Sequence, residues 1–166
     1  MHEEKQQQQQ PSHPDLFKVL RQGDPTSFSS KLVAERDFNK GETIADLTGL
    51  TLGPKKYSSV QISRTEHVEL NSDLLYLNHS CDPSTYLDIT KRAIVALKDI
   101  KQGGELTFFY PSTEWDMAQA FDCWCGADKC VGKVNGARHI PTKILEQFTL
   151  SEHIIQLLKE RDSQEQ

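Results

Sequence analysis

The sequence lacks a long apolar run and lacks an excess of positive charge. Among its 166 residues, 24 acidic side chains outnumber 19 basic ones and give a formal net charge of −5. Affinity for phosphates depends on clustered Lys and Arg, so we expect no direct nucleic-acid binding. No stretch approaches the ~18 apolar residues of a membrane helix, and residues 1–5 lack the apolar core of a signal peptide. We therefore expect an intracellular protein, nuclear or cytoplasmic, without membrane contact.

Apolar residues are also scarce, because they make up 36 % of the chain, which is below the usual globular share. Residues 1–15 are polar and contain the run Gln6–Gln10 and two prolines. Such a segment cannot bury enough apolar surface to offset its ordering entropy, so it predicts a disordered, Gln-rich tail. The remaining length favours a single domain, which we expect to be a monomer.

A glycine-rich turn between a strand and a helix is missing as well. Between residues 15 and 110, short apolar runs alternate with turn-forming residues. The runs are Leu32–Ala34, Thr43–Leu47, Ser59–Ile62, Tyr86–Ile89, Ala93–Leu97 and Leu106–Phe109. Closely spaced short strands without long helical periods predict a mainly β fold rather than a doubly wound one. A nucleotide-like cofactor would therefore have to bind in another way than in a Rossmann fold.

Residues 139–166 show a helical pattern instead. Pro141 precedes a plausible short helix over residues 142–148. Thr149 and Glu152 match a capping box and introduce an apolar stripe over residues 154–158. We predict a short C-terminal helical extension that frays from residue 162. The stripe could face a partner, but docking on the same domain is the simpler interpretation.

Cysteine is rare, with four residues at positions 81, 123, 125 and 130. In a reducing compartment thiols persist or bind metal, and Cys123 and Cys125 are too close in sequence to bridge each other comfortably. The spacing C-x-C-x4-C places three thiolates on one loop, where Gly126 permits the turn. With one further thiolate they complete a closed structural zinc site. The sequence thus predicts Zn²⁺ bound by Cys81, Cys123, Cys125 and Cys130.

Cys81 belongs to the segment Asn-His-Ser-Cys-Asp-Pro at residues 78–83, and Gly-Glu-Leu-Thr-Phe-Phe-Tyr follows at residues 104–110. Residues 34–42 form a further motif upstream, and the cysteine cluster comes last. In this order the four motifs resemble the SET-domain protein-lysine methyltransferases that carry a post-SET zinc motif. The resemblance covers roughly residues 28–136.

The resemblance implies a SET fold of short strands, in which the two central motifs form a pseudoknot. It divides the chain into a SET domain at residues 16–121 and a post-SET zinc segment at residues 122–138. The implied activity is methyl transfer from S-adenosylmethionine to the side-chain amine of lysine in a protein substrate. An acidic protein is compatible with a substrate that presents a basic, lysine-bearing tail.

Individual residues inherit expected roles from the resemblance. Tyr110 matches the active-site tyrosine, Asn78 and His79 match residues that hold the cofactor, and Trp124 matches the flap that packs on it. The expected cofactor-binding set is Ser30, Lys31, Leu32, Asn78, His79, Tyr110 and Trp124. Without that context, Asn78 could hold a turn, His79 could be a structural residue, and Tyr110 could be a core aromatic bonded to backbone.

One departure from the family concerns the cofactor loop. The usual Gly-x-Gly is replaced by Ser29-Ser30-Lys31, which adds side chains at a close-approach site. Either the loop is rebuilt, with Lys31 facing the cofactor carboxylate, or cofactor binding is weaker. Two alternatives therefore stay open: a non-catalytic SET-like binding module, and a methyltransferase acting on a small molecule. The short segment between Tyr57 and Asn78 is compatible with the latter.

Overall fold

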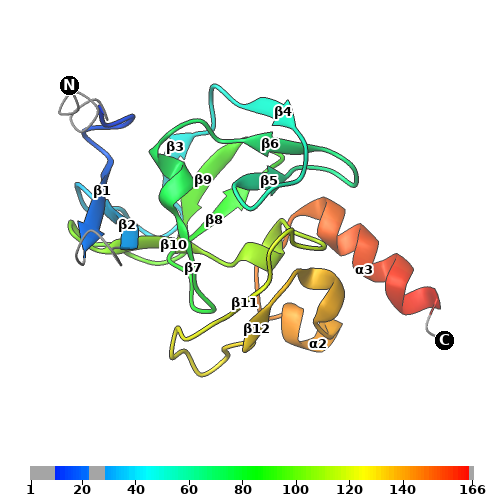
Figure 1. Ribbon diagram of the computed structural model, residues 1–166. Helices are drawn as coiled ribbons and strands as arrows, with labels where there is room; N and C mark the ends of the chain where they lie inside the picture. Colours follow the sequence, from blue (N-terminus) through cyan, green and yellow to red (C-terminus); the bar gives the residue numbers. More distant parts are fainter. Residues whose placement is uncertain (1–9, 23–28, 165–166) are drawn as a thin grey trace.

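Small β-sheets form the framework of this computed structural model, which describes residues 10–22 and 29–164 (Figure 1). The strands are β1 (Phe17–Gln22), β2 (Ser29–Ala34), β3 (Thr43–Asp46), β4 (Thr51–Gly53), β5 (Ser59–Gln61), β6 (His67–Glu69), β7 (Asn78–His79), β8 (Thr85–Asp88), β9 (Ala93–Ala96), β10 (Glu105–Phe108), β11 (Phe121–Asp122) and β12 (Lys133–Val134). They form sheets in the orders β1-β2-β10-β7, β3-β9-β8, β4-β6-β5 and β11-β12. The mainly β prediction is confirmed.

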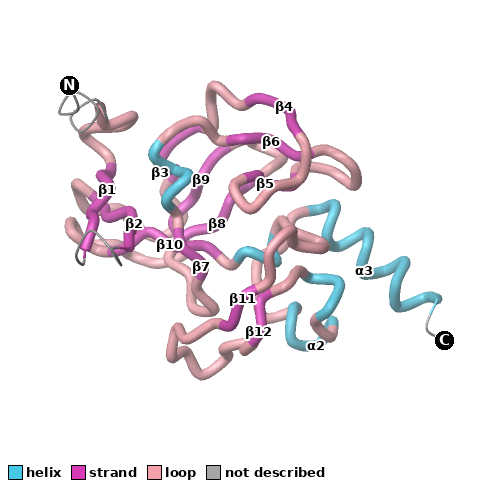
Figure 2. Tube along the Cα trace, viewed as in Figure 1, coloured by secondary structure: helices cyan, strands magenta, loops and turns pink. Residues whose placement is uncertain are grey.

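Helices are short and few, as Figure 2 shows. They are the 3-10 turns η1 (Asp73–Tyr76), η2 (Tyr110–Ser112) and η3 (Ala137–His139), and the α-helices α2 (Thr142–Leu145) and α3 (Glu152–Gln164). No helix of the described ranges is long and apolar enough to cross a membrane.

The main core lies between the sheets and explains why the apolar runs become strands. Leu32 on β2, Ile94 on β9 and Leu106 on β10 are fully buried and belong to one cluster with Phe17 and Phe38. Burying each such side chain contributes about 2 kcal/mol. Each of the six predicted runs overlaps a strand, namely β2, β3, β5, β8, β9 and β10.

The remaining strands were not predicted. β1 pairs with β2 over its whole length, and β4 and β5 both pair with β6. Polar residues are frequent in β1, β4 and β6, and β4 is exposed along its length. Their pairing partners decide their conformation more than their own residues do, because strand propensity depends on context.

The pairing of β7 with β10 positions the two central motifs. β7 lies parallel to β10, with Asn78 opposite Thr107 and His79 opposite Phe108. The Ser80 N–H also donates to the Phe108 carbonyl oxygen at 3.0 Å. Because 25 residues separate these strands in the chain, only the tertiary fold joins them. The expected association of the two motifs is thus present.

The C-terminal helices dock on the domain, as predicted. Ile154 and Leu158 of α3 are buried in a second cluster with Leu145 and Phe109. The expected cap at Thr149 was wrong, since α3 begins at Glu152 and the Ser151 carbonyl oxygen accepts the Ile154 N–H at 3.0 Å. The Ser151 N–H instead donates to Ser112 at 2.9 Å, so the chain is held in a non-helical contact up to that point.

The expected fraying from residue 162 was also wrong as far as residue 164, because α3 continues to Gln164. The side chain of Asp162 accepts hydrogen bonds from Thr142 Oγ1 at 2.5 Å and from Arg161 Nε at 3.0 Å. Arg161 Nη1 also donates to the Ile140 carbonyl oxygen at 2.8 Å. These contacts attach the last turns of α3 to the start of α2 and to the segment before it.

Part of the predicted N-terminal tail can be placed. Residues 1–9, with most of the glutamine run, lie outside the described residues. Within residues 10–15, the Ser12 N–H donates to Asp73 Oδ2 at 3.1 Å, and the Asp73 N–H donates to Ser12 Oγ at 2.9 Å. These reciprocal bonds attach the start of the described chain to η1.

Candidate functional site

Tyr110 stands where β10 ends and η2 begins. Its N–H donates to Nδ1 of His79 at 3.1 Å, and its hydroxyl donates to the Leu77 carbonyl oxygen at 2.7 Å. The ring packs against Phe108, with the centroids 4.8 Å apart. The pairing of β7 with β10 therefore determines where the Tyr110 phenol lies.

His79 connects Tyr110 to the cysteines. Burial lowers the pKa of His79 to about 4, so the imidazole is neutral at physiological pH. Because Nδ1 accepts the Tyr110 N–H, the ring proton resides on Nε2. Nε2 lies 3.3 Å from Sγ of Cys81, to which it can donate. The histidine thus supports a sulfur of the expected metal site.

All four cysteines converge, as the spacing predicted. Their sulfur atoms lie within 4.8 Å of one another, and Cys81 and Cys123 are 4.0 Å apart. Tetrahedral zinc with Zn–S bonds of about 2.3 Å implies sulfur separations of about 3.8 Å, so the donor set fits this ion. Burial raises the pKa of the Cys81 thiol, and that of Cys123 to about 11, so metal binding must displace their protons.

The strand pair β11-β12 closes the loop that carries three of these cysteines. Phe121 lies opposite Val134, and Asp122 lies opposite Lys133. The Val131 N–H donates to Sγ of Cys81 at 3.3 Å, which joins this loop to the Asn-His motif. This loop is therefore held against the Asn-His motif by a backbone N–H as well as by the sulfur cluster.

A cavity of about 440 Å³ lies beside the cysteines. It is lined by Asn78, His79, Glu105, Tyr110, Phe121, Asp122, Cys123, Trp124 and Cys125. The structure thus brings together four of the residues expected to hold the cofactor: Asn78, His79, Tyr110 and Trp124. Trp124 is 90 % exposed, so its indole is not packed on the rest of the described chain.

The expected residues on β2 are placed differently. Asn78 Nδ2 donates to the Ser30 carbonyl oxygen at 2.9 Å, which puts Ser30 next to the cavity. Lys31 does not belong to the residues that line it. Leu32 is fully buried in the core opposite Leu106, so its side chain is separated from the cavity.

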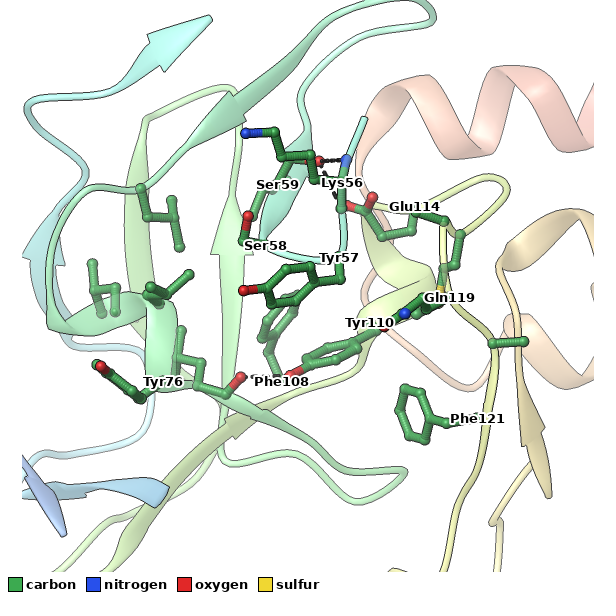
Figure 3. A pocket seen from close by; sticks show the side chains of 18 residues that line it. Lys56, Tyr57, Ser58, Ser59, Tyr76, Phe108, Tyr110, Glu114, Gln119 and Phe121 are labelled. Atoms are coloured by element: carbon green, nitrogen blue, oxygen red, sulfur yellow. Dashed lines mark hydrogen bonds between the residues drawn. The ribbon is translucent and has the colours of Figure 1, made fainter. Parts of the chain in front are cut away.

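A second cavity, of about 480 Å³, has mainly apolar and aromatic walls (Figure 3). Figure 3 shows Tyr57, Phe108 and Tyr110 gathered in its middle. Tyr110 and Phe121 line both cavities. The two cavities therefore meet at these two side chains.

The second cavity also contains a buried carboxyl group, Glu114, that sequence reasoning missed. Its Oε2 accepts the Gln61 N–H at 2.8 Å and the Thr113 hydroxyl at 2.8 Å. Burial raises the pKa of Glu114 to about 7. Nothing in the sequence around position 114 indicates this placement, because Gln61 comes from a distant strand.

Other lining residues were missed although a signal existed. Glu105 stands in the quoted Glu-Leu-Thr motif, and Phe121 and Asp122 directly precede the first clustered cysteine. Their proximity to expected site residues in sequence could have identified them. Tyr57 and Tyr76, which line the second cavity, had no such signal.

Comparison with known proteins agrees with this geometry. Residues 29–111 match the SET domain family, which is the stretch from β2 to η2 and contains Asn78, Cys81 and Tyr110. A methyltransferase from Aspergillus flavus, flvH, is 40 % identical over 153 residues, covering 90 % of this chain and 84 % of that protein.

More distant relatives are named histone-lysine N-methyltransferases. The H3 lysine-36 specific enzyme of Schizosaccharomyces pombe is 27 % identical over 147 residues, covering 83 % of this chain and 17 % of that protein. ASHH3 of Arabidopsis thaliana is 28 % identical over 151 residues, covering 75 % of this chain and 40 % of that protein. The chain thus spans less than half the length of these two relatives. The matched stretch and the relatives, together with the pairing of the two central motifs, show that the chain belongs to the SET domain family and is related to methyltransferases.

Proposed function

We propose that this SET domain transfers a methyl group from S-adenosylmethionine to the side-chain amine of lysine in a protein substrate. The observation that carries the proposal is that one side chain, Tyr110, lines two cavities of different character. An in-line displacement needs the methyl donor and the acceptor amine on opposite sides of the transferred group. Two cavities that meet at one tyrosine can provide that arrangement.

The first cavity fits the cofactor by the chemistry of its lining. Asn78 offers an amide, and Trp124 and Phe121 offer aromatic faces. Glu105 and Asp122 are carboxylates, which favour a cationic sulfonium nearby. When bound there, S-adenosylmethionine supplies an electrophilic methyl group.

The second cavity suits the acceptor. A lysine amine must lose its proton before it can attack, although its free pKa is about 10.4. Aromatic and apolar walls exclude water, which disfavours the ammonium form at the reacting centre. Alignment of the neutral amine then accounts for a large part of the barrier reduction.

Tyr110 would orient the amine. Its hydroxyl proton is engaged by the Leu77 carbonyl oxygen, which leaves the phenol oxygen as an acceptor. Burial raises the pKa of Tyr110 to about 12, so the phenol stays protonated at physiological pH. We therefore assign it an orienting role rather than that of a general base.

The four cysteines would hold a structural Zn²⁺. Cys123 and Cys125 also line the first cavity, so an ordered metal site would shape the wall on which the cofactor rests. His79 would support the site through its contact with Cys81.

The decisive experiment is calorimetric titration of the zinc-loaded protein with S-adenosylmethionine, followed by transfer of labelled methyl groups. Acceptors are lysine peptides, matched peptides with norleucine in place of lysine, and free alkylamines. Label on lysine but not on norleucine peptides supports the proposal. Absence of cofactor binding would instead favour a non-catalytic binding module.

Label confined to free amines would favour a small-molecule methyltransferase. One observation makes this second candidate worth testing: flvH, of which this chain covers 84 %, is named only a methyltransferase. The volume of the second cavity also falls within the range of small-ligand sites.

A further inference from the structure

Glu114 is a feature of the second cavity that the proposed methyl transfer does not use. Among the described residues lining this cavity it is the one carboxyl group, and it is only 8 % exposed. The one basic residue of the lining, Lys56, is exposed. The other walls are mostly aromatic and aliphatic. A buried acidic group in such a setting is costly unless it has a cationic partner.

The backbone fixes Glu114 in place. Its N–H donates to the Tyr110 carbonyl oxygen at 3.1 Å, and its carbonyl oxygen accepts the Ala137 N–H at 2.8 Å. Gln61, which donates to the carboxylate, accepts the Trp115 N–H at 2.8 Å through its own side chain. Backbone hydrogen bonds with Tyr110 and Ala137 therefore fix the main chain of Glu114. The bond between Trp115 and Gln61 fixes the residue that donates to its carboxylate.

Only one carboxylate oxygen is used by the protein. Oε2 accepts two hydrogen bonds, whereas no donor within residues 10–22 and 29–164 reaches Oε1. Burial raises the pKa of the group to about 7, and a cation in the cavity would favour the charged form again. Aromatic walls would add cation–π attraction for the same guest.

We propose that Glu114 is the residue that recognises the positive charge of the substrate. An alkylammonium group enters the second cavity and donates to the open Oε1 of Glu114, between aromatic walls that include Tyr57 and Tyr110. The identification of this guest as the methyl acceptor rests on the proposed function. Glu114 binds the ammonium form, which releases a proton to water before methyl transfer, so loss of Glu114 should raise KM without lowering kcat.

Binding of n-butylammonium, followed by NMR, tests this without any methyl transfer. Glu114→Gln keeps an acceptor for Gln61 and Thr113 but removes the charge. We expect it to weaken n-butylammonium binding about ten- to a hundredfold, the size of a lost hydrogen bond to a charged group. Glu146→Gln, which removes an exposed charge at the end of α2, is the matched control.

A neutral probe of similar shape, 1-pentanol, separates charge recognition from loss of the cavity. Its affinity should be the same for the wild-type protein and for Glu114→Gln. If both probes weaken equally, or if n-butylammonium binds the variant as well as the wild type, the proposal is overturned. Melting temperature and zinc content of each variant report whether it is folded.

The wild-type protein alone offers a test that needs no variant. Because the ionised carboxylate binds the cation, n-butylammonium affinity should fall as the pH decreases from 8 to 6.5. An affinity that does not change over this range would overturn the proposal. Titratable and charged groups near Glu114 are Lys55, Lys56, Tyr57, Tyr110 and His153. Burial lowers the pKa of His153 and raises that of Tyr110, so both side chains stay neutral between pH 6.5 and pH 8.

Methyl-transfer kinetics distinguish the two sources of the ammonium group and the two proposals. With a lysine peptide or with n-butylamine as acceptor, Glu114→Gln should raise KM about ten- to a hundredfold without lowering kcat. The acceptor that shows this effect identifies the source. Glu114-dependent binding without any transfer would sink the proposed function alone, whereas transfer with an unchanged KM would sink only the role of Glu114.

Discussion

The hydroxyl of Tyr110 donates a 2.7 Å hydrogen bond to the carbonyl oxygen of Leu77, the residue just before β7. This contact is the one expected for a structural tyrosine, and it is also compatible with the orienting role proposed for Tyr110. With its proton engaged, the oxygen retains lone pairs that can accept from an amine. The same bond can therefore fix the ring and orient the substrate.

Replacing Tyr110 by Phe tests which role dominates. We expect kcat for methyl transfer to fall about a hundredfold, because the amine loses its orienting partner, while cofactor affinity stays within about threefold. The lost bond to Leu77 should cost about 1 kcal/mol of unfolding free energy. Tyr86→Phe on β8, outside both cavities at Tyr110, is the matched control. Unreduced turnover by Tyr110→Phe would contradict the orienting role.

Metal content and chelation test the cysteine cluster. Freshly purified protein should contain one zinc per chain, and Cys81→Ser or a strong chelator should remove it. Since structural zinc adds several kcal/mol to the folded state, the melting temperature should fall by roughly 10 °C or more. Added Zn²⁺ should restore the chelated wild type, whereas Mg²⁺, which prefers oxygen ligands, should not. A metal-free protein with unchanged melting temperature would contradict the site.

The predictable part of this molecule is the part in which local sequence and fold agree. The apolar runs around Leu32, Ile94 and Leu106 become core strands, because their residues both favour strands and must be buried. The cysteine spacing likewise predicts a cluster, since three ligands lie on one loop. Asn78, His79 and Tyr110 were found through motifs and are joined by the pairing of β7 with β10.

Other features depend on contacts that no local pattern encodes. Glu114 becomes a buried cavity carboxyl because Gln61, from a strand 53 residues away in sequence, donates to it. Helix α3 begins after the expected Thr149 because Ser151 first bonds to Ser112. In each case tertiary packing overrides the local pattern.

Gly136 illustrates a further tertiary constraint that can be tested by mutation. It has φ +114°, and a Cβ there would lie 2.4 Å from the carbonyl oxygen of Trp115. The next residue, Ala137, donates its N–H to Glu114. We expect Gly136→Ala to lower the unfolding free energy by about 3 kcal/mol, from backbone strain and overlap combined.

The matched control is Gly49→Ala, where φ is +70° but no atom lies within 4 Å of the added Cβ. Strain without overlap should cost only about 1 kcal/mol there. Urea unfolding of both variants at the same pH gives the comparison. Equal losses for the two substitutions would mean that the contact between Gly136 and Trp115 contributes nothing.

The raised pKa of Glu114 makes stability depend on pH. The folded state holds this proton up to about pH 7, against an ordinary value of 4.5 for the unfolded chain. Between these values the folded protein binds more proton than the unfolded protein. Stability therefore falls as the pH rises, by about 3 kcal/mol over the whole interval and by about 1 kcal/mol between pH 6 and pH 8.

Glu114→Gln removes this titration. The unfolding free energy of the variant relative to the wild type should accordingly increase by about 1 kcal/mol from pH 6 to pH 8. Urea unfolding at several pH values measures the difference, in which effects common to both proteins, including those on the cysteines, cancel. Glu160→Gln is the control that should show no pH-dependent difference in this range, because the hydrogen bond from Arg64 lowers the pKa of Glu160 from its ordinary value of 4.5. A difference between Glu114→Gln and wild type that stays constant across this range would contradict a folded-state pKa of about 7 for Glu114.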